Sequence, residues 1–348
     1  MRAQRRGQHA GKTAILGVGG DADDAEPRGD DEFRVLAAVA SGERGILATK
    51  LHADGRHNQL LYVDGGPSTT GTVGKLRMKG QEVFRHAVTN LASVLREVLE
   101  TDGVTLAGGI ERAGSAALGQ DLGLLAGLEA AGVVATDDVA ALAASAQVVI
   151  EFSTPEATLA NAAICATHGC AHVIGTTGLS GEQETTLRGL ADRAAIVWAP
   201  NMSVGVNLLL GLVEQVARTL DPSYDIEILE MHHRHKVDAP SGTALALGRA
   251  AARGRDAPFE QKAVTVRDGI TGARRSGDIG FATLRGGDVV GEHRVLFVGA
   301  GERIELSHVA SDRRIYSAGA VRAAIWAARQ PPGLYGMAEV LGLRPAGA

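Results

Sequence analysis

Five side chains able to carry a positive charge follow one another at residues 232–236, as His-His-Arg-His-Lys. The segment ends a predicted strand, and alternation along an extended chain would place residues 232, 234 and 236 on one side and 233 and 235 on the other. Crowded cations lower one another's pKa, which brings a histidine or lysine closer to the range useful for donating protons near neutral pH. The segment therefore predicts a general acid.

A predicted helix begins a few residues further on, at Ser241, Gly242 and Thr243. The first turn of a helix has free backbone N–H groups and the positive end of the helix dipole, and two hydroxyls stand beside them here. These features favour a bound carboxylate or phosphate. The sequence thus predicts an acid and an anion site close together.

Two other interpretations of this region remain open. In the first, the histidines are solvated surface residues and Ser241 only caps a helix. In the second, His233 and His235 bind zinc, although no carboxylate or cysteine stands at convincing ligand spacing beside them.

The elements that must position these residues follow two patterns. From residue 104 onward, β-rich runs at 104–111, 148–153, 172–177 and 195–201 alternate with helical segments, which is typical of a parallel sheet covered by helices. Thr154 and Pro155 can start one helix that Gly169 ends, and Ser180 with Gln183 fits a capping box for the next. The first half is therefore predicted to be α/β.

After Asn201 the regular alternation of short β runs and helices ends. Helices are predicted at 203–220 and from Ser241, and β runs at 225–233, 279–284 and 289–307, the last with a turn at 299–301. A final helix, 317–329, could fold back on the first half. This order predicts an α+β domain with an antiparallel sheet and helices on one side.

Three loops at the ends of the predicted parallel strands could bind a ligand. In a dinucleotide fold, an acid such as Glu111 accepts from a ribose 2′-hydroxyl and a neighbouring arginine such as Arg112 pairs with a 2′-phosphate, which would permit NADH or NADPH. The other two loops are Gly175-Thr176-Thr177-Gly178 and Ala199-Pro200-Asn201-Met202. Taken singly, each also fits an ordinary turn or a surface ion pair.

Composition limits the remaining possibilities. A chain of 348 residues suits two domains, and its formal charge of -5 argues against a nucleic-acid partner. No apolar run reaches the roughly 18 residues that a membrane helix needs, and the basic N-terminus has no apolar stretch behind it. Cys165 and Cys170 are expected to be reduced core residues, so the location predicted is the cytoplasm.

From about residue 95 to 343, the chain resembles the 4-hydroxy-tetrahydrodipicolinate reductases of lysine and diaminopimelate biosynthesis. The resemblance depends on residues 230–244, Glu-Met-His-His-Arg-His-Lys-Val-Asp-Ala-Pro-Ser-Gly-Thr-Ala, with support from 175–178, 201–207 and 280–285. It implies a Rossmann-like α/β nucleotide-binding domain (95–202 plus 317–345) and an α+β domain (203–316) that binds substrate and builds a homotetramer.

The resemblance also implies roles for individual residues. His232 and Lys236 would be the acids, His233 would contact the dicarboxylate substrate, and Gly242 and Thr243 would hold one of its carboxylates. NADPH or NADH would supply a hydride and would contact Glu111, Arg112, Gly175, Thr176, Thr177, Ala199, Pro200, Asn201 and Met202.

The first 94 residues depart from that family. Its first strand and glycine loop, of the type G-x-x-G-[RK]-M-G, should fall near residues 81–90, where the sequence is Gln-Glu-Val-Phe-Arg-His-Ala-Val-Thr-Asn. The nearest imitation of that loop is the glycines at 17–20. Residues 21–32 are acidic and turn-rich and are expected to be loop or disordered, and residues 82–99 have the apolar spacing of an amphipathic helix. Residues from about 44 to 94 resemble a fragment of β-ketoacyl-acyl-carrier-protein synthase III, through 45–55 and 76–84, without that family's cysteine, histidine and asparagine motifs. We therefore expect a chimera joined near Val94, with an empty first-strand position in the sheet. The alternative function is a chain that binds dicarboxylate but not nucleotide.

Overall fold

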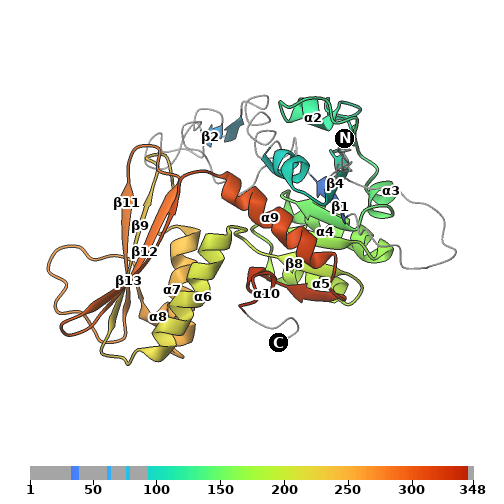
Figure 1. Cartoon of the computed structure of the whole chain (residues 1–348). Coiled ribbons are helices and arrows are strands. Elements are labelled where there is room, and N and C mark those ends of the chain that lie inside the picture. The colour runs from blue at the N-terminus through green and yellow to red at the C-terminus, as the bar shows by residue number, and fades with distance from the viewer. Residues whose placement is uncertain (1–32, 39–60, 64–75, 79–92, 344–348) are drawn as a thin grey trace, which may run out of the picture. The chain divides into compact units, whose positions relative to one another are not determined.

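The computed structural model describes residues 33–38, 61–63, 76–78 and 93–343 (Figure 1). The glycines at 17–20, the acidic segment 21–32 and most of the helix predicted at 82–99 lie outside these ranges, although residues 93–100 are helical. The described chain forms two compact units. Unit 1 contains the described residues of 1–42, 88–197 and 321–334, and unit 2 contains those of 43–87, 198–320 and 335–348.

Unit 1 is built on the sheet β14-β8-β7-β6-β1-β4-β5. Its inner strands β4 (Val104–Ile110), β6 (Val148–Glu151) and β7 (Ala171–Ile174) are almost wholly buried, as expected for parallel strands covered on both faces. With β8 (Ala195–Trp198) they confirm the four predicted β runs, although each strand ends before the predicted run does. No element was predicted between residues 112 and 147, where the structure has α2 (Leu122–Leu125), β5 (Ala135–Thr136) and α3 (Val139–Ala143).

The expectation of an empty first-strand position is wrong. Strand β1 (Phe33–Ala38) lies between β4 and β6 and pairs parallel with both. The sheet therefore takes its central strand from the N-terminal segment. A six-residue β run carries little information about its partner, which is set here by hydrogen bonding across the sheet.

The helices of unit 1 start and stop where their capping residues predict. Helix α4 (Pro155–His168) begins after Thr154, whose hydroxyl accepts from the Ala157 N–H, and ends at Gly169 with φ of 66°. Helix α5 (Gly181–Leu190) has the capping box of Ser180 and Gln183. The cysteines beside α4 are buried and free, as predicted.

Unit 2 is a sheet of order β10-β11-β9-β12-β13 with two long helices. Its strands are β9 (Asp225–His232), β10 (Ala263–Val264), β11 (Ile279–Arg285), β12 (Gly291–Val298) and β13 (Arg303–Ala310). Strand β12 is antiparallel to β9 and β13, but β11 runs parallel to β9, so the prediction of an antiparallel sheet is only partly right. The parallel pair arises because α7 (Gly242–Gly254) connects β9 to the rest of the chain and returns it to the same end of the sheet.

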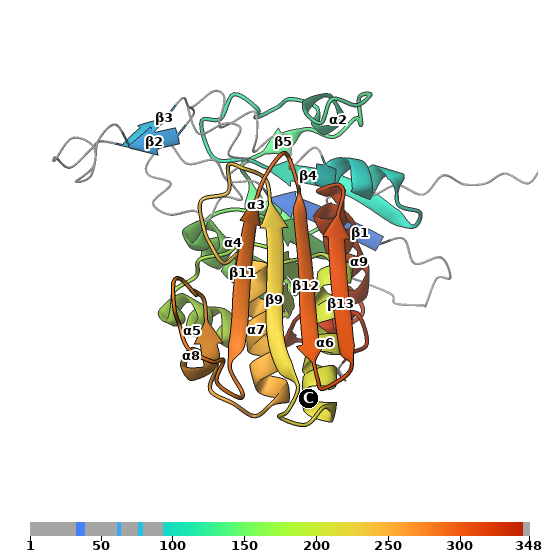
Figure 2. The ribbon, with the colours of Figure 1, turned by 90° about the vertical axis from the view of Figure 1, so that its left-hand side faces the viewer.

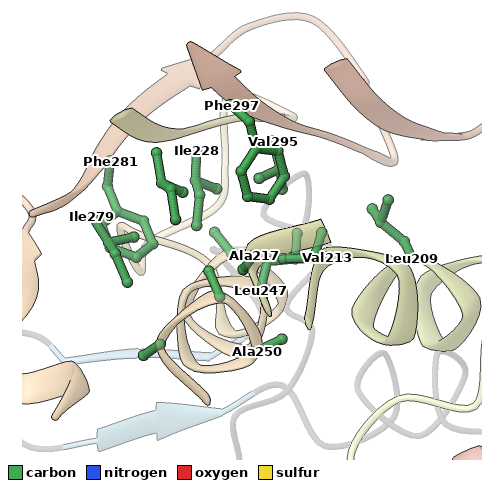
Figure 3. Close-up of a cluster of buried hydrophobic side chains, with 14 residues drawn as sticks. Leu209, Val213, Ala217, Ile228, Leu247, Ala250, Ile279, Phe281, Val295 and Phe297 are labelled. Atoms are coloured by element: carbon green, nitrogen blue, oxygen red, sulfur yellow. The ribbon is translucent and has the colours of Figure 1, made fainter. Parts of the chain in front are cut away.

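Helices α6 (Val204–Thr219) and α7 cover one face of this sheet (Figure 2). The core between them contains Ile228, Phe281 and Phe297 from the strands, packed over Val213 and Leu247 from the helices (Figure 3). Along each strand, the same face becomes polar toward one end. That polar end carries the predicted acid.

The last elements are short apart from one helix. Helix α8 (Phe259–Lys262) precedes β10, and α9 (Arg314–Ala327) starts in unit 2 and continues into unit 1, followed by β14 (Gly333–Tyr335) and α10 (Met337–Val340). Strands β2 (Leu61–Val63) and β3 (Leu76–Met78) form a separate antiparallel pair. In the part of the chain that the structure describes, no helix is both long and apolar enough to cross a membrane.

Candidate active site

A polar row crosses the helix-covered face of the unit 2 sheet. Glu230 of β9 stands opposite Thr283 of β11 and His293 of β12, and His232 stands opposite Arg285. Glu230, His232 and His293 are all buried, with exposed fractions of 1%, 9% and 5%. Buried polar groups need partners, and these residues supply them to one another.

Glu230 is the centre of the row. Its carboxylate lies 2.5 Å from Nδ1 of His232, accepts two hydrogen bonds of 2.8 and 2.9 Å from Arg285, and accepts one of 3.0 Å from the Ser241 N–H. Burial alone would raise the pKa of this carboxyl, but the hydrogen bonds from His232 and Arg285 outweigh that effect and hold the pKa at about 2. Glu230 is therefore an anion at neutral pH.

His293 is the neutral member of the row. Its Nε2 lies 3.1 Å from Oγ of Ser241, and its ring packs edge-on against His232 with the centroids 5.1 Å apart. Burial, followed by the nearby charge of His232, lowers the pKa of His293 to about 3. At neutral pH its imidazole can bond to Ser241 without adding a charge to the site.

This depressed pKa makes stability depend on pH. The unfolded chain protonates His293 below about pH 6.5 and the folded chain only below about pH 3, so its contribution to stability is complete above pH 6.5 and is lost as pH falls toward 3. We expect the free energy of unfolding to fall by about 1.4 kcal/mol per pH unit in this window from His293 alone. In urea titrations at pH 7, 6 and 5, His293→Gln should show a shallower slope than the wild type, whereas the exposed control His168→Gln should not. Equal slopes for His293→Gln and wild type would contradict the prediction.

The cationic segment turns instead of continuing as a strand. Strand β9 ends at His232, and the Lys236 N–H donates to the carbonyl of His233 across a tight turn. The predicted alternation of sides over 232–236 is therefore wrong, because alternation needs an extended backbone. The cations also have acidic partners that were not predicted, since Lys236 Nζ lies 2.8 Å from Asp238 just as His232 lies against Glu230.

The predicted anion site lies at the start of α7. Ser241 is the N-cap: its hydroxyl accepts from the Ala244 N–H, while its own N–H bonds to Glu230. Gly242 has open space where a Cβ would lie, and the Thr243 hydroxyl accepts from the Asn201 side chain at 3.3 Å. The N–H and hydroxyl of Ser241 are thus already used within the fold, so Gly242 and Thr243 are better placed to meet an anion.

In unit 1, strand pairing brings two predicted nucleotide loops to one edge. Ile110, Ala38, Glu151 and Ile174 form one row across β4, β1, β6 and β7, so the residues that follow them share an edge. Glu111 is buried there and accepts from the Arg112 N–H at 2.9 Å. At Gly175 a Cβ would lie 2.0 Å from the Phe152 ring, so the backbone passes where only glycine fits. A buried acid and a bare backbone at the carboxyl edge suit a dinucleotide.

A buried hydrogen-bond network under this edge was not predicted. Glu151 lies 2.7 Å from Nε2 of His172 and also accepts from the side chains of Ser153, Thr158 and Asn161. Thr176, predicted to contact nucleotide, instead receives the Ser153 N–H and the Thr158 hydroxyl on its Oγ1. Its side chain therefore ties two loops together. The available signal was a glutamate and a histidine at buried positions of apolar strands.

The third predicted loop, 199–202, follows β8 directly. Ala199 and Met202 are buried, Pro200 is exposed, and Asn201 bonds to the Ser203 N–H and to Thr243. Gly319 of α9 passes so close that a Cβ would lie 1.7 Å from the Met202 carbonyl oxygen. This loop is thus fixed to the start of α7. As for the zinc interpretation, no group of three or more metal-binding side chains gathers within the described ranges.

A parallel nucleotide-type sheet in one unit, and a histidine–carboxylate site in an α+β unit, define a two-domain nucleotide-dependent reductase. Two family models match the chain, dihydrodipicolinate reductase N-terminus over residues 92–202 and dihydrodipicolinate reductase C-terminus over 205–341. The chain belongs to the dihydrodipicolinate reductase family.

Relatives and a solved structure agree with this assignment. A 4-hydroxy-tetrahydrodipicolinate reductase of Afipia carboxidovorans is 56% identical over 251 residues, which cover 72% of this chain and 92% of that protein. One from Rhodopseudomonas palustris is 54% identical, with 72% and 93% covered. The dipicolinate-bound dihydrodipicolinate reductase of Paenisporosarcina sp. TG-14 shares the fold, with a TM-score of 0.57 at 20% identity, over 86% of this chain and 97% of that one. These comparisons do not support the predicted resemblance of residues 44–94 to synthase III; the family matches begin at residue 92.

Proposed function

We propose that this chain reduces 4-hydroxy-tetrahydrodipicolinate to tetrahydrodipicolinate with NADH or NADPH, in lysine and diaminopimelate biosynthesis in the cytoplasm. The supporting observation is that one carboxylate, Glu230, bonds both to the candidate acid His232 and to Ser241, the N-cap of α7. Acid and anion site are therefore connected through a single side chain. The family assignment supplies the substrate.

Each residue then has a part in the reaction. Gly242 and Thr243 receive a substrate carboxylate at the positive end of the α7 dipole, and His233 contacts the substrate. His232 and Lys236 hold the proton that completes the reduction and balance the negative charge of the substrate. When bound, the nicotinamide supplies a hydride.

The nucleotide is assigned to the loops at the carboxyl edge of unit 1. Glu111 and Arg112 would contact the adenosine ribose or its 2′-phosphate, and the loops at 175–177 and 199–202 would contact the rest of the nucleotide through their backbones. With both an acid and an arginine present, either nucleotide could be accepted.

The test is oxidation of NADPH or NADH, followed by its absorbance, by the full chain with enzymatically generated substrate. We expect oxidation that depends on substrate, together with nucleotide binding in a fluorescence titration. A folded chain that neither binds nucleotide nor oxidises it would reject the proposal in favour of a protein that only binds a dicarboxylate.

We also propose that the chain forms a homotetramer through the sheet face that α6 and α7 leave uncovered. That face presents half-buried or exposed apolar side chains among charges of both signs, a mixture suited to a self-complementary contact between copies. They are Met231, Leu284, Leu296, Val298 and Val309, with Glu227, Arg294 and Glu305. A monomer mass by light scattering would exclude this assembly.

A further inference from the structure

Glu230 connects the candidate acid to the anion site. One oxygen of its carboxylate lies 2.5 Å from Nδ1 of His232, and the other accepts the Ser241 N–H at 3.0 Å. Both contacts are buried, so no water competes for them. The position of one side chain therefore fixes the imidazole and the first turn of α7 together.

Arg285 holds this carboxylate in place and keeps it ionised. Its guanidinium bonds to both oxygens of Glu230, and it is itself fixed by donating to the Asp238 carbonyl at 2.6 Å. An ionised carboxylate only accepts hydrogen bonds. Nδ1 of His232 must therefore be the donor in its contact with Glu230.

The other ring nitrogen of His232 faces β12. Gly291 stands there, and a Cβ at this position would lie 3.1 Å from Nε2. Since glycine has no side chain, the position of β12 that stands opposite His232 puts no side chain against Nε2. This nitrogen is the one left to exchange a proton with a ligand.

We propose that Glu230 is a positioning residue, which holds the neutral His232 ring as the Nδ1–H tautomer so that the transferable proton is carried at Nε2. The inference rests on the proposed function, because it assigns the donor atom for that reduction. The neutral ring first binds a proton from solvent at Nε2 and becomes an imidazolium. In the step, the Nε2–H bond breaks, a C–H bond forms on the substrate, and the ring returns to the neutral Nδ1–H form. The electron pair that the reduction needs comes from the hydride of the nucleotide.

Glu230→Gln tests the tautomer directly. Its amide oxygen would turn to the Arg285 guanidinium, which leaves the amide NH₂ facing Nδ1 of His232 and favours the opposite tautomer. We expect kcat to fall by about 10²–10⁴-fold, the range associated with a misoriented catalytic histidine, while the Kd for NADPH stays the same. Glu230→Asp, which keeps the charge, should recover part of the loss.

Glu214→Gln is the matched control. Glu214 lies on α6 and is also paired with two arginines, Arg218 and Arg253. These partners belong to α6 and α7, outside the polar row and outside the sheet face proposed for the homotetramer. Losing this carboxylate should leave kcat unchanged.

The pH profile separates positioning from a general structural role. The charged and titratable groups around the adjacent rings of His232 and His293 are Glu230, Arg285, His308 and Lys236, the last paired with Asp238. Glu230 is the anion in direct contact with His232, and removing it makes a protonated imidazole less favourable. The high-pH limb of kcat should therefore move to lower pH, by about one unit, in Glu230→Gln only.

The deciding measurement is the ¹⁵N NMR spectrum of the His232 ring in histidine-labelled full-length chain, assigned by loss of the signal in His232→Gln. We expect the Nδ1–H tautomer in the wild type and in Glu214→Gln, and the Nε2–H tautomer in Glu230→Gln. An Nε2–H tautomer in the wild type would overturn the inference, even if Glu230→Gln did not fold. Since the spectrum needs no turnover, a wild-type chain with the expected tautomer but no reductase activity would reject the proposed function alone.

Discussion

Replacing His232 with glutamine is expected to lower kcat for substrate reduction by about 10²–10⁴-fold, the contribution typical of a positioned general acid. Glutamine is polar and can still bond to Glu230 through its amide, so the buried row keeps a partner for the carboxylate. It cannot carry a transferable proton. The loss should therefore appear in kcat, measured by NADPH oxidation, with little change in the unfolding midpoint.

His235→Gln provides the control, because His235 lies in the turn after β9, outside the buried row, and should retain near wild-type kcat. Lys236→Ala tests the second candidate acid, and the double variant His232→Gln/Lys236→Ala should abolish turnover. If the two side chains serve one proton transfer, the double variant will lose less than the product of the two single losses. Wild-type kcat in His232→Gln would remove this residue from the mechanism.

The local parts of the fold follow from short stretches of sequence. The caps at Thr154, Gly169 and Ser180 set the limits of α4 and α5 because a cap needs only a few adjacent residues. Ser241 likewise marks the start of α7. Helix propensity and capping hydrogen bonds act within one turn of chain, so the ends of these helices can be predicted from sequence.

The long-range parts could not be predicted in the same way. The position of β1 depends on which strands accept its hydrogen bonds, and the parallel pairing of β11 with β9 depends on the path of α7. Neither is encoded in a local pattern. A short β run such as 33–38 acquires its place only when the sheet forms.

The candidate site also has a part that could be predicted from local sequence and a part that could not. The motif at 230–244 placed the acid and the anion site near each other because they are close in sequence. No role was predicted for Arg285 or His293, which come from β11 and β12 and meet Glu230 and His232 only through strand register. The pairing of His232 with Glu230 and of Lys236 with Asp238 was not predicted either. The contact with Glu230 is what fixes the orientation of the His232 ring.

The buried network of unit 1 leads to the second large effect, on stability. Glu151→Leu is expected to destabilise the protein by about 3–5 kcal/mol, because it removes the acceptor that a fully buried His172 and three other polar side chains share. The network also holds Thr176 beside the predicted nucleotide loop, so the Kd for NADPH should rise. Urea unfolding followed by circular dichroism measures the first effect, and fluorescence titration the second. Glu156→Leu, an exposed site on the first turn of α4, should cost less than about 1 kcal/mol.

A double-mutant cycle shows whether the destabilisation by Glu151→Leu arises from leaving the buried His172 without its partner. Replacing both members of a buried polar pair by apolar residues removes their hydrogen bond, but it leaves neither group buried without a partner. The desolvation cost that each single substitution causes is then absent. Glu151→Leu/His172→Leu should therefore be more stable than the sum of the two single changes predicts, by about 0.5–3 kcal/mol. Additive losses would mean that Glu151 stabilises unit 1 through Ser153, Thr158 and Asn161 alone, and the 2.7 Å contact with His172 would then contribute nothing of its own.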